Sequence, residues 1–142
     1  MKKVFDYMSD KKHYTSDACV VWCFDARFSR LLERFVKDKC FQNIDLVCVA
    51  GGAKDLAAPE READREYLRD QIRKSIALHH TKQVVLMVHD ECGAYGGKSD
   101  QNFYIKELEL ASTHLKKYFQ EIDINVPISL YYADFQCLSK IE

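Results

Sequence analysis

The chain has 142 residues, of which 47% are hydrophobic and 30% are charged, and its formal net charge at pH 7 is -1. This length and composition predict one globular domain, spanning residues 1–142, whose core is large enough to need no disulfides. The nearly balanced charge gives no electrostatic reason to expect nucleic acid or an anionic membrane surface as a partner.

The apolar stretches and the N-terminus bear on where the protein is located. ACVVWCF (18–24) and VVLMV (84–88) are too short to cross a bilayer. The N-terminal MKKVFDYMSDKK carries lysines but lacks the apolar core of a signal peptide. We therefore expect a cytoplasmic protein that has no membrane partner.

The first half of the chain alternates buried strands with helices. ACVVWCF is continuously apolar, which is typical of a strand in a parallel sheet. The segment 27–38 has apolar residues at helical spacing, and IDLVCVA (44–50) is a second strand that ends at Gly51 and Gly52. A charged helix is expected from Pro59, near its first turn, to about His79.

The same alternation continues in the second half. The expected elements are a buried strand, a glycine-bearing loop, a long helix, a fourth strand and a short return strand, over residues 83–89, 91–102, 103–121, 127–135 and 136–142. This pattern predicts a three-layer α/β domain with a mainly parallel sheet in the order 2-1-3-4 and helices on both faces. The return strand would be an antiparallel edge strand.

Six cysteines need an explanation in a cytoplasmic chain. Disulfides are not expected in a reducing compartment, so burial, metal binding and catalysis remain. Four cysteines lie in or beside apolar segments and are expected to be buried structural thiols: Cys19, Cys40, Cys48 and Cys137. Cys23 and Cys92 differ, because each lies at or just beyond the end of a predicted strand.

The predicted strand order brings three metal-binding side chains together. Ligands of open α/β sheets bind beyond the carboxyl ends of the strands, where the strand order reverses. Cys23 ends the first strand, His89 ends the third, and Cys92 follows three residues later. Two thiolates and an imidazole suit zinc and leave one tetrahedral position for water or substrate. The alternative is that both cysteines are simply buried thiols.

Asp25 and Arg27 follow Cys23 at alternate positions, in CFDAR (23–27). In an extended segment all three side chains would point to one side, with Arg27 paired to Asp25. The pair could act on a ligand of the metal site. Alternatively, it could be a structural ion pair that caps the following helix.

Three stretches resemble the β-class carbonic anhydrases: CFDAR (23–27), VAGGAKDL (49–56) and HDECGAYGG (89–97). The motifs of that family are C-x-D-x-R and H-x-x-C-G. The similarity runs from about Ala18 to Gly97 and more loosely through the last helix and the LYYADF strand. The family usually carries Arg-Asn-Ala-Gly-Asn after the second strand, whereas this chain has VCVAGGAKD.

The resemblance implies a zinc ion held by Cys23, His89 and Cys92, with Asp25 and Arg27 as a catalytic dyad beside it. It implies a lyase that reversibly hydrates CO2 to bicarbonate through zinc-bound hydroxide, as a homodimer or a multiple of dimers. Asp25 would orient the nucleophile by accepting a hydrogen bond, and Arg27 would hold the carboxylate in place. In some members of the family the equivalent aspartate binds the metal instead.

Two other functions remain open on the same scaffold. One is a zinc hydrolase of another small linear molecule, such as carbon disulfide or carbonyl sulfide. The other is a catalytically silent, zinc-stabilised domain, which the missing arginine and asparagines of VCVAGGAKD favour. Direct assays of each gas would separate these functions.

Overall fold

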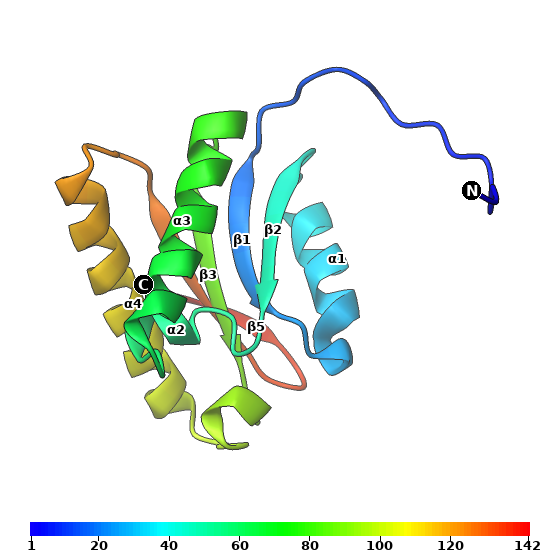
Figure 1. The fold of residues 1–142 in the computed structure, drawn as a ribbon. Helices are drawn as coiled ribbons and strands as arrows, with labels where there is room; N and C mark the ends of the chain where they lie inside the picture. Colours follow the sequence, from blue (N-terminus) through cyan, green and yellow to red (C-terminus); the bar gives the residue numbers. More distant parts are fainter.

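A five-stranded sheet in the order β2-β1-β3-β4-β5 forms the middle layer of the computed structural model, which describes residues 1–142 (Figure 1). The strands and helices, in chain order, are β1 Ala18–Cys23, η1 Ala26–Phe28, α1 Ser29–Asp38, β2 Ile44–Val49, α2 Lys54–Ala57, α3 Glu62–His79, β3 Val84–His89, η2 Gly93–Tyr95, α4 Gln101–Glu121, β4 Ile128–Ala133 and β5 Leu138–Ile141. The first four strands pair in parallel and β5 is antiparallel to β4. The predicted α/β class, strand order and edge strand are confirmed.

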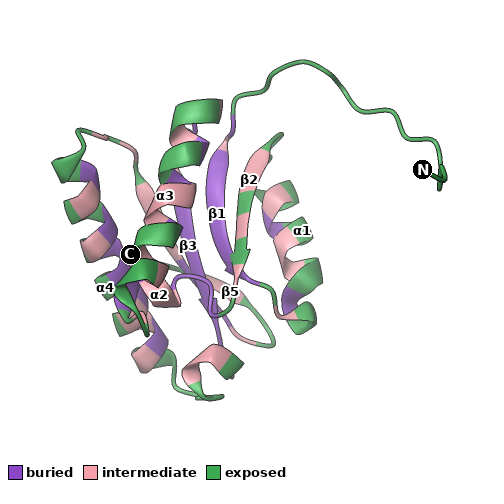
Figure 2. Cartoon of the chain, in the orientation of Figure 1, coloured by how far each residue is buried: buried purple, intermediate pink, exposed green.

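The central strands β1 and β3 are buried along their whole length (Figure 2). They read ACVVWC and VVLMVH, without the alternation of polar and apolar residues that marks a half-exposed strand. Helices therefore have to cover both faces of the sheet. The α1 helix lies on one face, and α2, α3 and α4 lie on the other (Figure 1).

The two faces carry hydrophobic clusters of different size. The cluster on the side of α2, α3 and α4 contains 18 buried residues, and the cluster under α1 contains nine. Leu108, Ala111 and Leu115 of α4 are fully buried against the sheet, so α4 is the most firmly packed support on that side. Tyr104 of this helix also hydrogen-bonds the loop that follows β3.

Several local predictions were wrong at the ends of elements. The α3 helix begins at Glu62 rather than near Pro59, because Arg61 is still extended, with φ -133° and ψ 141°. A short helix, α2, was not predicted. CFDAR does not continue as a strand: Ala26–Phe28 form a 3-10 helix, so the Asp25–Arg27 pair arises from a turn.

Three of the four cysteines expected to be buried are exposed: Cys40, Cys48 and Cys137. Cys40 lies in the turn after α1 with φ 55°, and Cys137 lies in the turn between β4 and β5. Cys48 is on β2, an edge strand, where the same face is also exposed at Leu46. Only Cys19 is buried as predicted.

A polar cluster joins the chain before β1 to the sheet and α3. Asp45 of β2 accepts hydrogen bonds from the hydroxyls of Tyr14 (2.7 Å) and Ser75 (2.6 Å), and the Nδ1 atom of His79 lies 2.8 Å from the same carboxylate. Burial raises the pKa of Asp45, but these partners outweigh it and hold the pKa below its usual value. Residues 1–13 extend away from this anchor and are exposed (Figure 2). No helix is long and apolar enough to pass through a bilayer.

The loop after β2 closes over the carboxyl ends of β1 and β3. Gly52 has φ +57°, and a Cβ atom placed on it would lie 2.3 Å from the carbonyl oxygen of Met87 and 3.3 Å from the nitrogen of Cys23. The next residue, Ala53, donates its N–H to the same Met87 carbonyl at 3.2 Å. Gly52 is therefore required both for its backbone angle and for its lack of a side chain.

We expect Gly52→Ala to lower the free energy of unfolding by about 2–5 kcal/mol, because it adds a steric clash to the cost of a left-handed backbone. Gly96→Ala is the matched control, since Gly96 has φ +75° but no atom within 4 Å of the added Cβ. It should lose only about 1–2 kcal/mol. Urea denaturation of both variants measures the difference, and equal losses would contradict the packing role of Gly52.

Candidate metal centre

Cys23, His89 and Cys92 converge at the carboxyl edge of the sheet. Cys23 and His89 are the last residues of the neighbouring strands β1 and β3, and Cys92 lies in the loop after β3. Their ligand atoms all lie within 4.8 Å of one another, and the two Sγ atoms are 4.0 Å apart. All three side chains are buried. The adjacency of the two strands, predicted from their order, produces this cluster.

One ring nitrogen of His89, Nε2, has no hydrogen-bond partner and lies near the sulfur atoms of Cys23 and Cys92. Its Nδ1 atom lies 2.8 Å from the carbonyl oxygen of Asp90. A carbonyl oxygen only accepts hydrogen bonds, so Nδ1 carries a proton, and in the neutral imidazole Nε2 carries a lone pair. Nε2 is buried and has no hydrogen-bond partner. Phe28 and Trp22 enclose the ring, with centroids 4.4 Å and 5.7 Å away.

The thiols of Cys23 and Cys92 contact each other and shift each other's pKa in opposite directions. A hydrogen bond from Cys92 lowers the pKa of the Cys23 thiol against the opposing effect of burial, and backbone N–H groups of Asp25 and Gly51 lower it further. The same hydrogen bond and burial raise the pKa of Cys92. Cys23 therefore loses its proton more readily than Cys92, and a cation beside both sulfurs would favour loss of the second proton.

Asp25 and Arg27 form a bidentate ion pair beside the cluster. The guanidinium donates from Nε to Asp25 at 3.1 Å and from NH2 at 2.7 Å, and the backbone N–H of Arg27 donates to Asp25 Oδ1 at 3.0 Å. These bonds, chiefly those of the side chain, lower the pKa of Asp25 to about 2. Asp25 Oδ2 lies 3.9 Å from Nε2 of His89.

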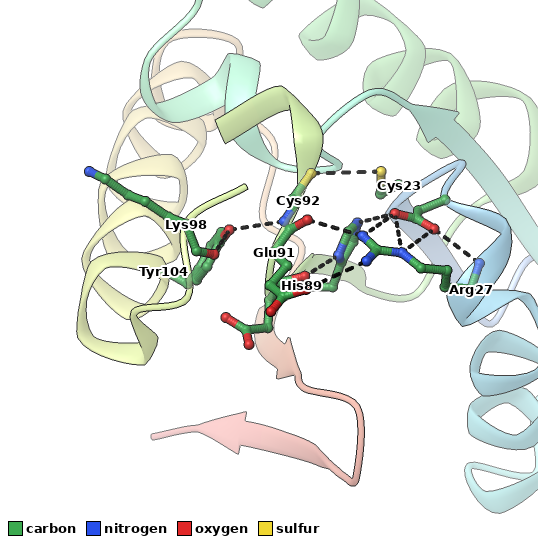
Figure 3. A network of polar contacts seen from close by, with 9 residues as sticks. Cys23, Arg27, His89, Glu91, Cys92, Lys98 and Tyr104 are labelled. Atoms are coloured by element: carbon green, nitrogen blue, oxygen red, sulfur yellow. Dashed lines mark hydrogen bonds and ion pairs between the residues drawn. The ribbon is translucent and has the colours of Figure 1, made fainter. Parts of the chain in front are cut away.

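Arg27 also connects the loops after β1 and β3. Its NH2 group donates to the backbone carbonyl of Glu91 at 3.0 Å, while the same guanidinium holds Asp25 (Figure 3). Its guanidinium carbon lies 5.2 Å from the centroid of the Phe135 ring. The position of the Asp25 carboxylate is therefore tied to the loop that carries Cys92.

The structure brings together all five residues singled out in the sequence: Cys23, Asp25, Arg27, His89 and Cys92. Asp25 also caps the 3-10 helix by accepting from the Arg27 N–H, so the local structural role weighed above is real as well. Sequence reasoning missed three neighbours of the site. Phe28 follows Arg27 directly and lay within the predicted helix 27–38, whereas Glu91 and Tyr104 contribute through contacts that have no local motif.

The residues present fit a thiophilic divalent metal. A buried nitrogen lone pair without a hydrogen-bond partner is costly unless something else binds it, and here it faces two sulfur atoms. Two sulfurs and one imidazole nitrogen are the donors that zinc takes in sites with an open fourth position. The group Cys23, His89 and Cys92 can therefore hold a metal ion.

Comparison with known proteins points to one family. The sequence profile of the family described as "Putative carbonic anhydrase" matches residues 13–142. A comparison with curated protein sequences finds no match.

Several solved structures share the fold. The β-carbonic anhydrase isoform I of Trichomonas vaginalis superposes with a TM-score of 0.62 at 13% identity, covering 96% of this chain and 87% of that one. The carbonic anhydrase of Glaciozyma antarctica gives a TM-score of 0.51 at 18% identity, covering 92% of this chain and 84% of that one. A tetrameric β-carbonic anhydrase of Sordaria macrospora gives 0.52 at 12% identity, with coverages of 90% and 81%.

Proposed function

The chain belongs to the β-carbonic anhydrase family, and we propose that it is a single-domain zinc lyase that reversibly hydrates CO2 to bicarbonate. The observation that carries the proposal is the unpartnered Nε2 of His89, buried among two thiols and beside the Asp25–Arg27 pair. Cys23, His89 and Cys92 are the proposed zinc ligands. When bound, zinc acts as a Lewis acid that brings the pKa of a coordinated water from about 15.7 to about 7.

The proposed role of Asp25 is to orient the attacking oxygen. An ionised carboxylate can only accept hydrogen bonds, so it fixes the O–H of the nucleophile and directs a lone pair away from itself. Arg27 keeps Asp25 in one orientation by donating from Nε to Oδ1 and from NH2 to Oδ2, and it is itself held by the Glu91 carbonyl. Both residues are proposed to act as catalytic groups beside the ligand cluster.

We expect the purified protein to contain one zinc per chain, and Cys92→Ala to lose both zinc and thermal stability, since metal binding and folding are coupled. Removal of zinc with a chelator should lower the melting temperature of the parent protein in the same way. Elemental analysis measures the metal content.

Cys19→Ala is the matched control for this loss. Cys19 is a fully buried thiol of β1, the strand that ends at Cys23, but it is not part of the ligand cluster. It should lose some stability through the cavity it creates and keep its zinc. Full zinc occupancy in Cys92→Ala would rule out the proposed ligand set.

Asp25→Asn should retain zinc and fold but hydrate CO2 about 10–100-fold more slowly, because the nucleophile loses its orienting charge. Each tenfold loss corresponds to about 1.4 kcal/mol of transition-state stabilisation. Asparagine still caps the 3-10 helix as an acceptor, so little stability should be lost. Stopped-flow hydration, zinc content and melting temperature on one preparation give the three quantities.

Arg27→Ala should slow hydration similarly by releasing Asp25, whereas Glu91→Gln should change the rate little. Arg27 bonds to the backbone carbonyl of Glu91, which glutamine retains, and the Glu91 carboxylate is 3.7 Å from Arg27 NH1. A purely structural ion pair predicts lower stability with an unchanged rate per folded molecule.

A parent protein that binds zinc and hydrolyses carbon disulfide or carbonyl sulfide but does not hydrate CO2 would transfer the proposal to that substrate class.

We propose that the protein is a homodimer or a multiple of dimers. Large apolar side chains are exposed beside the site at Phe24 and Phe135, and in the N-terminal segment at Phe5 and Met8. Such side chains are typically covered by a partner. Light scattering at micromolar concentration should give at least twice the 16.6 kDa mass of the chain, and a monomer would contradict the proposal.

A further inference from the structure

The loop that carries Cys92 packs inward through Cys92 and Tyr95 but is open on the side of its glycines. It is closed by backbone bonds, from Glu91 N–H to the Lys98 carbonyl and from Gly97 N–H to the Cys92 carbonyl, both 2.9 Å. A Cβ atom added at Gly93, Gly96 or Gly97 would meet no atom within 4 Å. These bonds shape the loop. It is joined to the sheet at Asp90, whose N–H donates to the Ala133 carbonyl, and to Arg27 at Glu91, but the backbone N–H of Cys92 needs an anchor of its own.

Tyr104 of α4 supplies that anchor. Its hydroxyl accepts a hydrogen bond from the backbone N–H of Cys92 at 3.1 Å and donates one to the carbonyl of Lys98 at 2.8 Å (Figure 3). The two bonds fasten both ends of the loop through one oxygen atom. The Cys92 N–H would otherwise be a buried donor without a partner.

The Tyr104 ring is itself firmly placed. It is fully buried, stacks on Tyr132 with centroids 5.7 Å apart, and meets Tyr95 edge-on at 5.2 Å. The α4 helix beneath it packs against the sheet through fully buried side chains. A rigid helix is a better support for a ligand-bearing loop than the loop itself.

We propose that Tyr104 is a positioning residue for the metal site: its hydroxyl holds the Cys92 sulfur in place to bind together with Cys23 and His89. This inference rests on the proposed zinc site. Partners of this kind, beyond the ligands, typically change metal affinity by about 10–100-fold when they are removed. The sequence carries no sign of this role, because Tyr104 lies twelve residues after Cys92 on another element.

The test is Tyr104→Phe, which keeps the aromatic packing and removes only the bridging hydroxyl. We expect zinc affinity, measured by competition with a chelator, to fall by about 10–100-fold. In the cobalt-substituted protein, the thiolate charge-transfer and d–d bands should shift, because the Cys92 sulfur is no longer held in one place. A merely structural hydroxyl would lower the melting temperature and leave those bands unchanged.

Tyr95→Phe is the matched control, because the Tyr95 hydroxyl lies in the same aromatic cluster, is buried and has no hydrogen-bond partner. It should keep the parent's zinc affinity and cobalt spectrum. The rate of zinc release to a chelator from already loaded protein is a second measurement, which stays valid if metal-free Tyr104→Phe unfolds. That rate should rise in Tyr104→Phe alone.

Two failures are distinguishable. A parent that binds zinc, with a Tyr104→Phe variant of equal affinity, release rate and cobalt spectrum, overturns the positioning role and leaves the proposed function standing. A parent that binds no zinc overturns the proposed function, and the positioning role with it.

Discussion

The Nε2 atom of His89 lies in the interior at the end of β3 without a hydrogen-bond partner, close to the sulfur atoms of Cys23 and Cys92 and 3.9 Å from a carboxylate oxygen of Asp25. In the neutral imidazole it carries a lone pair. Protein interiors seldom leave such an atom unbonded, because desolvation without a new partner is unfavourable. The surrounding structure keeps it so: the Asp90 carbonyl accepts the Nδ1 proton, and Phe28 and Trp22 pack against the ring. The remaining polar groups of the site are arranged around this nitrogen.

Two loops that are far apart in the sequence are joined around it by a single guanidinium. Arg27 binds the Asp25 carboxylate from the loop after β1 and the Glu91 carbonyl from the loop after β3. From the opposite side, Tyr104 of α4 bonds the Cys92 N–H. The loop bearing Cys92 is thus fastened at two neighbouring residues, once toward the dyad and once toward the larger core. Precise placement of ligands requires supports of this kind, since a displacement of about 1 Å can cost two orders of magnitude in rate.

Much of the site followed from strand ends alone. Continuous apolar runs identified β1 and β3, and the position of Cys23 and His89 as their last residues placed both at one edge of the sheet. The contacts that surround the site and fix its shape could not be predicted from the strand ends. The need for glycine at position 52 depends on the carbonyl of Met87, which belongs to another strand, and the exposure of Cys48 depends on β2 being an edge strand that α1 does not fully cover. Neither property is local.

The sequence by itself determined the elements and the chemistry of the ligand set, because hydrophobic periodicity and residue type are local properties that any neighbour in space must accommodate. The tertiary structure alone decided how that set is held. Asp25 and Arg27 were expected to share a side through strand alternation, yet a 3-10 turn brings them together. Tyr104 contacts the site only because α4 packs beside the loop after β3, where its hydroxyl accepts the Cys92 N–H. Contacts between distant segments depend on how whole elements pack, and no short stretch of residues encodes that packing.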